Sequence, residues 1–239
     1  MMKIILARLT VLIAGFLLLI SIGTCGIPSY PYLYPPEALD GGRVGFSHDS
    51  DNDPTVFAGY EFFYRFYSTD PGTVGGSGQA VQDIQSYFTS SFQISSVVYE
   101  DESSAFSYGF RRAYVEPGGD AQPQLSIKAS DINTTFNIEL LDDNSINEVK
   151  FSYDSSLYFL KRSVTDTNDD YKSFLPLNDS DVYDFNVGEE DIIDDDVDSD
   201  NIFVAFYAVP YGIDPETLAT LYANGNYEGM EYIGSFQLY

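Results

Sequence analysis

The 239-residue sequence contains a single cysteine, a single histidine and no tryptophan. One cysteine cannot form a disulfide within the chain, and it cannot supply a zinc site made of several thiolates. One histidine excludes zinc and iron sites that take two or more histidines from the same chain. Without tryptophan, tyrosine is the side chain left to stack on a sugar. The sequence thus excludes several common classes of metal centre.

Basic residues are also scarce, with 11 lysines and arginines against 37 acidic residues and a formal net charge of −26. A nucleic-acid partner requires a basic face that releases counterions from the phosphates. We therefore predict that the protein does not bind nucleic acid. The 20 tyrosines and 18 phenylalanines nevertheless indicate a folded core rather than a disordered chain. The length allows one large domain or two small ones.

The first 24 residues have the pattern of a secretory signal peptide. Lys3 and Arg8 give a positively charged start, residues 11–20 are almost wholly apolar, and small residues follow. An apolar run this short is typical of a signal peptide rather than of a membrane-spanning helix. We therefore assign residues 1–24 to a signal peptide and exclude them from the fold.

The only cysteine lies directly after this segment. The stretch Ile22-Gly23-Thr24-Cys25 resembles the lipobox of bacterial lipoproteins, with Thr24 where that family prefers Gly, Ala or Ser. The resemblance implies that Cys25 is lipidated, becomes the new N-terminus and anchors the protein without a transmembrane helix. The alternative is a soluble secreted protein that is cut after Gly23 or Gly26.

A segment rich in proline and tyrosine follows the cysteine. Residues 26–36 contain four prolines and three tyrosines, and proline favours extended backbone in itself and in the residue before it. We predict that residues 25–36, the lipidated cysteine included, form a stiff stalk. An equally open alternative is that the tyrosines of this segment pack on the folded body.

Most of the remaining chain carries β-strand signals. Segments rich in aromatic and β-branched residues alternate with turn formers such as Pro71-Gly72 and Asn224-Gly225-Asn226. We predict strands at 44–47, 57–67, 95–99, 106–115, 125–129, 135–140, 149–153, 157–160, 202–209 and 232–238. Short helices are predicted at 79–88 and, with Pro215 near its start, at 214–223. The predicted fold class is mainly β, a β-sandwich with one or two short helices.

Two neighbouring segments alternate strictly between apolar and polar residues. They are Phe136-Asn137-Ile138-Glu139-Leu140 and Val149-Lys150-Phe151-Ser152-Tyr153. This period is typical of strands with one face in water. A loop rich in Asp and Asn separates them, so we predict that they form a hairpin.

The opening of the body resembles a fibronectin type III domain. The resemblance is carried by Pro35-Pro36-Glu37-Ala38-Leu39, by Val44-Gly45-Phe46-Ser47 and by Gly59-Tyr60-Glu61-Phe62-Phe63-Tyr64-Arg65. Phe46 stands where that family usually has tryptophan. The resemblance implies that Tyr60, Phe62 and Tyr64 face the core and that Glu61, Phe63 and Arg65 face outward.

The end of the chain resembles the last two strands of the same family. The alternation of Val204, Phe206 and Ala208 is similar to its penultimate strand, and residues 233–238 would form its last strand. The resemblance implies a fibronectin type III-like or immunoglobulin-like sandwich made of residues 37–66 plus 201–239. Residues 67–200 are then an inserted β-rich subdomain that ends in an acidic loop at 179–200. The alternative is a local similarity of strand patterns.

No motif points to catalysis. His48 lies in a polar stretch that we interpret as a solvated loop, and no Gly-x-Ser-x-Gly elbow or phosphate-binding glycine loop is found. We therefore predict that the protein is not an enzyme. The abundance of carboxylates leaves a glycoside-hydrolysing pair of acids as an alternative that the sequence does not exclude.

Alternating acids are the one feature that indicates a metal ligand set. Asp194, Asp196, Asp198 and Asp200 alternate, as do the oxygen ligands of two further stretches: Asp49, Asp51 and Asp53, and Asp166, Asn168 and Asp170. Oxygen ligands at alternate positions bind calcium when the chain turns around the ion. None of the three stretches has the glycine and glutamate of an EF-hand, and dense acids are usually solvated loops. We keep calcium at 194–200 as the only cofactor candidate.

Taken together, the sequence predicts a lipid-anchored, non-catalytic bacterial cell-envelope protein with a binding or structural role. Its partners would be the membrane, through the N-terminal lipid, and a protein or carbohydrate ligand at the cell surface. It would lie at the cell membrane or the outer membrane, facing the periplasm or the exterior, with secretion as the alternative. A calcium-dependent adhesion module and a hydrolase with a carboxylate pair are the rival functions.

Overall fold

A computed structural model of the chain describes most of the residues after position 32. The described residues are 33–88, 110–116, 121–122, 124–127, 131, 134–143, 146–164, 171–174, 201–215, 217–218, 220–222 and 229–238. The predicted signal peptide, Cys25 and the acidic loop 179–200 lie outside them, as does the predicted strand 95–99.

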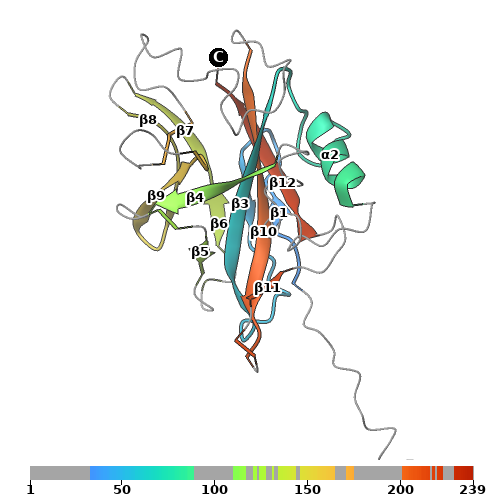
Figure 1. Ribbon diagram of the computed structural model, residues 1–239, viewed down its shortest axis with the longest axis vertical. Helices are drawn as coiled ribbons and strands as arrows, with labels where there is room; N and C mark the ends of the chain where they lie inside the picture. Colours follow the sequence, from blue (N-terminus) through green and yellow to red (C-terminus); the bar gives the residue numbers. More distant parts are fainter. Residues whose placement is uncertain are drawn as a thin grey trace, which may run out of the picture. The chain divides into compact units, whose positions relative to one another are not determined.

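Two β-sheets make up the body (Figure 1). The smaller sheet has the order β1-β2-β6, formed by β1 (Glu37–Ala38), β2 (Gly45–Ser47) and β6 (Thr135–Asn137). The larger sheet contains β3 (Phe57–Tyr67), β4 (Arg111–Glu116), β5 (Leu125–Ser126), β7 (Glu139–Asp143), β8 (Ile146–Tyr153), β9 (Ser156–Lys161), β10 (Phe203–Ile213), β11 (Thr220–Tyr222) and β12 (Glu231–Gln237). Its order is β11-β10-β3-β4-β9-β8-β7, with β12 added to β10 and β5 to β3. One helix, α2 (Gln79–Phe88), is found in the described residues. The predicted mainly-β class is confirmed.

The strand order at the centre of the body follows that of immunoglobulin-like sandwiches. β1, β2 and β6 form one sheet, while β3 pairs with β10 and β10 pairs with β12, all antiparallel. In the immunoglobulin fold, strands A, B and E lie in one sheet and strands C, F and G in the other. Membership of the fibronectin type III family stays a prediction.

Aromatic side chains from both sheets meet in the main core. Phe46 on β2 stacks on Phe136 of β6 at 4.7 Å between ring centroids, and it meets the edge of Tyr60 on β3 at 4.8 Å. Phe62 and Tyr64 are also fully buried in this core. The predicted inward direction of the alternating residues on β3 is thus confirmed, because side chains two positions apart on a strand share one face.

The opposite face of β3 is also covered, which the sequence analysis did not expect. Glu61 and Phe63 do lie opposite to the main-core residues, but they are buried, and only Arg65 is half-exposed. Helix α2 packs over this face through Ala80 and Ile84, which lie one turn apart on the same side of the helix. The expectation that this face of β3 is in water was therefore wrong for Glu61 and Phe63.

Strands from residues 67–200 extend the larger sheet directly. β4 pairs with β3 through Phe62 and Ala113, and β9, β8 and β7 continue outward from β4. The larger sheet therefore contains strands from both ranges, 37–66 plus 201–239 and 67–200. The domain boundaries proposed from the sequence stay a prediction.

Two segments have a different structure from the one predicted. The second helix, predicted at 214–223, is wrong, because β10 continues to Ile213 and Thr220–Tyr222 forms β11 beside it. The cross-strand pairing with β10 outweighs the helix-start signal of Pro215. The predicted hairpin forms between β7 and β8, but its first segment divides at Ile138 into β6 and β7.

Candidate functional site

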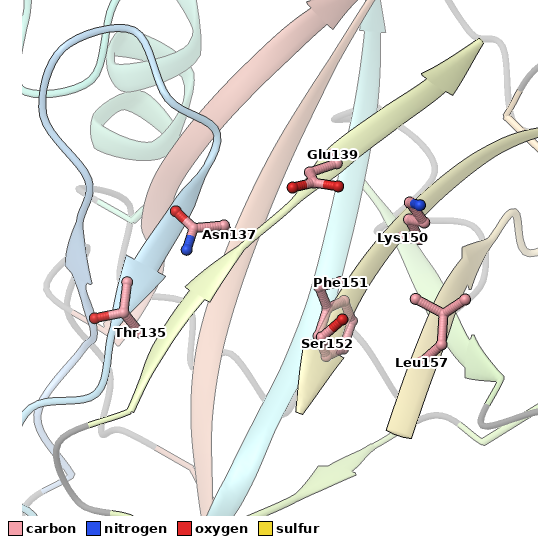
Figure 2. A pocket seen from close by; sticks show the side chains of 7 residues that line it. All are labelled: Thr135, Asn137, Glu139, Lys150, Phe151, Ser152 and Leu157. Carbon is pink, nitrogen blue, oxygen red and sulfur yellow. The ribbon is translucent and has the colours of Figure 1, made fainter. Parts of the chain in front are cut away.

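A hollow of about 170 Å³ opens at the solvent-exposed side of β6, β7, β8 and β9 (Figure 2). It is lined by Thr135, Asn137, Glu139, Lys150, Phe151, Ser152 and Leu157. Phe151 belongs to the buried core, whereas the other six side chains are exposed or half-exposed. The hollow is smaller than pockets that enclose drug-sized ligands, which usually exceed about 300 Å³.

The hollow exists because the chain changes sheets at Ile138. Asn137 pairs with Gly45 of β2, whereas Glu139 pairs with Lys150 of β8. The Ile138 N–H donates to the Val44 carbonyl at 2.9 Å, which pulls the chain toward the smaller sheet. The strand that carries Asn137 and Thr135 therefore diverges from β8, as Figure 2 shows, and among the described residues the last residues of β8 pair with β9 alone. The hollow is the opening that results between β6, which pairs with β2, and β8, which pairs with β9.

Four polar side chains at the hollow have no partner among the described residues. Asn137, Glu139, Lys150 and Ser152 make no side-chain hydrogen bond or ion pair there. The backbones of these four residues belong to paired strands, so the positions of their Cα atoms are fixed. Together they offer amide, carboxylate, ammonium and hydroxyl groups, and Leu157, 43% exposed, adds an apolar surface. The hollow can thus donate and accept hydrogen bonds while it contacts an apolar ring face.

These polar residues occupy the solvent-facing positions of the two alternating segments in the sequence. The alternation indicated that they face water. It could not show that they surround a hollow, because that depends on the pairing of β6 with β2, whose residues lie about 90 positions earlier in the chain.

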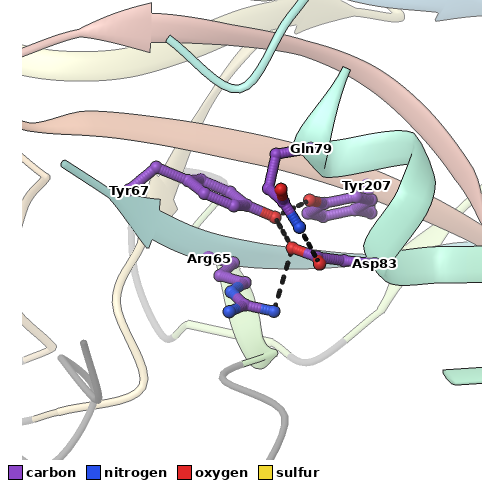
Figure 3. Close-up of polar contacts among 5 residues, drawn as sticks. All are labelled: Arg65, Tyr67, Gln79, Asp83 and Tyr207. Atoms are coloured by element: carbon purple, nitrogen blue, oxygen red, sulfur yellow. Dashed lines mark hydrogen bonds and ion pairs between the residues drawn. The ribbon is translucent and has the colours of Figure 1, made fainter. Parts of the chain in front are cut away.

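A second polar cluster joins α2 to the larger sheet (Figure 3). Asp83 accepts hydrogen bonds from the Tyr67 hydroxyl at 2.9 Å and from the Gln79 amide at 2.6 Å. Arg65 forms an ion pair with Asp83 at 3.1 Å, and the Tyr67 hydroxyl lies 2.8 Å from that of Tyr207. Burial raises the pKa of both Tyr67 and Tyr207, which keeps them neutral. The groups satisfy one another, so this cluster fastens the helix rather than offering a binding site.

His48 is a core residue and not the solvated loop residue that the sequence indicated. The residue is 6% exposed, and its ring packs against Phe57 at 4.4 Å between ring centroids and places Nδ1 2.8 Å from the Tyr60 hydroxyl. Burial lowers the pKa of His48, and the charge of Asp49 opposes this change. The neutral ring is therefore favoured, with its Nδ1 already engaged by Tyr60.

In the part of the chain that the structure describes, the alternating acids make local hydrogen bonds instead of converging on one point. Asp49 accepts a hydrogen bond from the Asp51 N–H at 2.8 Å, and Asp53 accepts from the Thr55 N–H and hydroxyl. These carboxylates close local turns and do not converge. Among the described residues, no three His, Cys, Asp or Glu side chains are grouped so that they could hold a metal ion. The calcium candidate at 194–200 and the stretch 166–170 lie outside those residues.

The lipidation candidate Cys25 also lies outside the described residues, so it stays a prediction. In the part of the chain that the structure describes, no helix is both long enough and apolar enough to cross a membrane. The last residues of the predicted stalk contact the body: Leu33 is buried in the main core, and Tyr34 exchanges hydrogen bonds with Asn52.

Sequence reasoning missed one titratable residue whose environment is unusual. Glu231 on β12 is half-buried, and burial raises its pKa to about 7. It pairs across the ladder with Ala208, which offers no charge or hydrogen bond to the carboxylate. A raised carboxyl pKa is frequent at catalytic sites. Glu231 does not line the hollow, where Glu139 is the one carboxylate, so it is not paired with a second acid there.

Glu231→Gln is expected to change the pH dependence of stability. The folded state binds the Glu231 proton more tightly than the unfolded state, so this contribution is present below pH 4.5 and is lost as the pH rises through 7. The variant should match the wild type near pH 4.5 and exceed its free energy of unfolding by about 2–3 kcal/mol at pH 8. Denaturant unfolding at both pH values measures this. Glu37→Gln, which removes an exposed carboxylate on β1, is the control, and an equal gain there would contradict the prediction.

Comparisons of the chain with protein-family models, with curated proteins and with solved structures give no match.

Proposed function

We propose that the protein is a lipid-anchored, non-catalytic component of a bacterial cell envelope and that its β-sandwich body binds a carbohydrate at the hollow of β6–β9. The anchor is supported by the signal-like segment and by Cys25 directly after it. The observation that carries the binding role is the set of polar side chains around the hollow that have no partner among the described residues.

The lining of the hollow matches the chemistry of a carbohydrate. Sugar hydroxyls both donate and accept hydrogen bonds, which matches the carboxylate of Glu139, the ammonium of Lys150 and the amide of Asn137. The C–H face of a sugar ring can lie on Leu157. The volume of about 170 Å³ favours a single ring, such as the end of a glycan, over a larger ligand.

Lys150→Ala and Glu139→Gln are each expected to weaken carbohydrate binding about tenfold or more, because each removes a hydrogen bond to a charged group. A glycan array identifies the preferred neutral sugar, and isothermal titration calorimetry measures its affinity for each variant. Glu37→Gln on β1 is the control for loss of charge and should bind as the wild type does. If no sugar binds at millimolar concentration, or if both hollow variants bind normally, the proposed ligand is wrong.

Cys25→Ser is expected to abolish acylation of the protein. The wild-type chain should incorporate an alkyne analogue of palmitate, and its mature N-terminal peptide should begin with an acylated Cys25. The variant should show neither property, because serine lacks the thiol that takes the lipid. Thr24→Ala is the matched control, since it brings the segment closer to the lipobox and should keep the label. A wild-type N-terminus with a free thiol, or one after Gly26, would contradict the anchor.

Protease treatment of intact cells then decides which side of the envelope the body faces. Release of peptides from residues 57–239 would place the body at the exterior and make surface glycans the ligands to screen. Protection until the envelope is opened would place it in the periplasm.

A further inference from the structure

Three of the four large apolar side chains that are exposed in the described residues lie at one end of the body. Leu218 is 78% exposed, Ile213 44% and Tyr34 38%, whereas the fourth, Leu157, lines the hollow. Leu218 and Ile213 flank the turn that joins β10 to β11, at the end of the larger sheet where Figure 1 labels β11.

Hydrogen bonds bring Tyr34 to the same end. The Ile213 N–H donates to the Val56 carbonyl at 2.8 Å, just before β3 begins. The turn that leads to Val56 contains Asn52, whose side chain accepts from the Tyr34 N–H at 2.8 Å and donates to the Tyr34 carbonyl at 3.0 Å. The chain that comes from Cys25 therefore joins the body at the end that carries Ile213 and Leu218.

The tip of the β10–β11 turn holds Leu218 in an outward position. The Leu218 N–H donates to the Asp214 carbonyl at 2.8 Å, and the Thr217 hydroxyl donates to the Asp214 carboxylate at 2.7 Å. Leu218 also has a φ of 59°, in the left-handed region that disfavours residues with a Cβ. Neither the backbone conformation nor packing against the rest of the body favours leucine at position 218. We therefore infer that Leu218 contacts something outside the body.

The length of the connection restricts which end of the body can face a membrane. Eight peptide steps separate Cys25 from Leu33, and they span at most about 28 Å when fully extended. β3 runs over 11 residues from this end to the opposite end, a distance of about 33 Å. If residues 25–33 ran back alongside the sheet, the connection would be shorter than β3 and would not reach its opposite end. A body tethered at Cys25 therefore cannot turn that opposite end toward the membrane.

We propose that the end formed by Tyr34, Ile213 and Leu218 faces the membrane and that Leu218 and Ile213 enter a zwitterionic lipid surface. This inference rests on the membrane tether of the proposed function. The exposed carboxylates of Asp51 and Asp53 flank Asn52 at the same end, and Asp49 is half-exposed beside them, so an anionic surface would repel it. The ammonium groups of zwitterionic headgroups can instead pair with these acids while the apolar tip contacts the acyl boundary.

The test places a fluorescent label on the tip of the full-length chain. A Cys25→Ser, Leu218→Cys variant has a single thiol and cannot be acylated at position 25, so the full-length chain is held on the vesicle by residues 1–24. It is reconstituted into phosphatidylcholine vesicles that contain a phosphatidylcholine with a nitroxide on the acyl chain. The matched control carries Thr69→Cys, an exposed site just after β3 at the opposite end. Ile213→Cys repeats the measurement in case the first variant misfolds.

We expect the nitroxide lipid to quench the label at the tip by about half or more and to leave the label at position 69 nearly unchanged. Replacing part of the phosphatidylcholine by phosphatidylglycerol should reduce quenching at the tip at low salt. Absence of quenching at positions 213 and 218, equal quenching at position 69, or stronger quenching on anionic vesicles would overturn the inference. Because Cys25 is replaced, this result is independent of acylation, which the mass of the wild-type N-terminal peptide tests separately.

Discussion

Replacing Glu61 by alanine is expected to lower the free energy of unfolding by about 3–5 kcal/mol. The Glu61 side chain on β3 is fully buried, forms an ion pair with Arg112 at 3.2 Å and accepts a hydrogen bond from the Gln124 amide at 2.6 Å. Alanine would leave the largely buried guanidinium of Arg112 without this carboxylate. Losing the attraction of a carboxylate in a site of low dielectric constant is costly, since charges there interact more strongly than they do in water.

Guanidinium unfolding, followed by circular dichroism and by tyrosine fluorescence in this tryptophan-free chain, measures the loss. Glu116→Ala is the matched control, because Glu116 is also on a strand and faces Lys161 at 3.6 Å, but its side chain is 30% exposed. Glu116 is half-exposed, and its partner Lys161 keeps a second ion pair with Glu148, so the control should lose less than Glu61→Ala does. A double-mutant cycle with Arg112→Ala isolates the pair. Equal losses for Glu61→Ala and Glu116→Ala would show that burial does not strengthen this interaction.

The sequence predicted those features of the fold that depend on neighbouring residues. The alternation on β3 and β10 placed Tyr60, Phe62 and Val204 correctly in the core, because the period of a strand is a local property. The burial of Glu61 could not be predicted in the same way. It depends on side chains such as Arg112 and Gln124, which reach β3 from about 50–60 residues further along the chain. Alternation indicates two faces of a strand, but it does not show which faces other parts of the chain cover.

The same limit applies to the candidate site. The sequence indicated that Glu139 and Lys150 lie on the wet face of a hairpin, and the structure pairs them across β7 and β8. The hollow beside them arises because Asn137 leaves that hairpin for β2, a long-range pairing that no local pattern encodes. His48 shows the opposite error: a polar stretch around it indicated solvent, yet the Tyr60 hydroxyl gives its ring a buried partner. A polar sequence context is therefore weak evidence for exposure when an aromatic hydroxyl can satisfy the residue.

Gly59→Ala is expected to destabilise the protein by about 3–5 kcal/mol, as the sum of steric overlap and backbone strain. A Cβ at this position on β3 would lie 1.9 Å from the Leu125 carbonyl oxygen of β5 and 2.9 Å from the Tyr211 ring. Gly59 also has a φ of 155°, which residues with a Cβ rarely adopt. The overlap is with backbone, so no rotation of a side chain can relieve it. β5 would have to move away from β3, and its pairing through Tyr60 and Leu125 would be lost.

Gly75→Ala separates the two contributions. Gly75 also has a positive φ, 69°, but a Cβ there would meet no atom within 4 Å. This variant therefore carries the backbone strain without the overlap and should lose about 1 kcal/mol. Denaturant unfolding of both variants gives the difference, and hydrogen exchange at residues 124–127 should increase in Gly59→Ala alone, because β5 pairs with β3 directly at Gly59. Similar losses in the two variants, with unchanged exchange in β5, would mean that β5 adapts to a Cβ at position 59. The close approach of the two strands would then not be needed to hold β5 in the sheet.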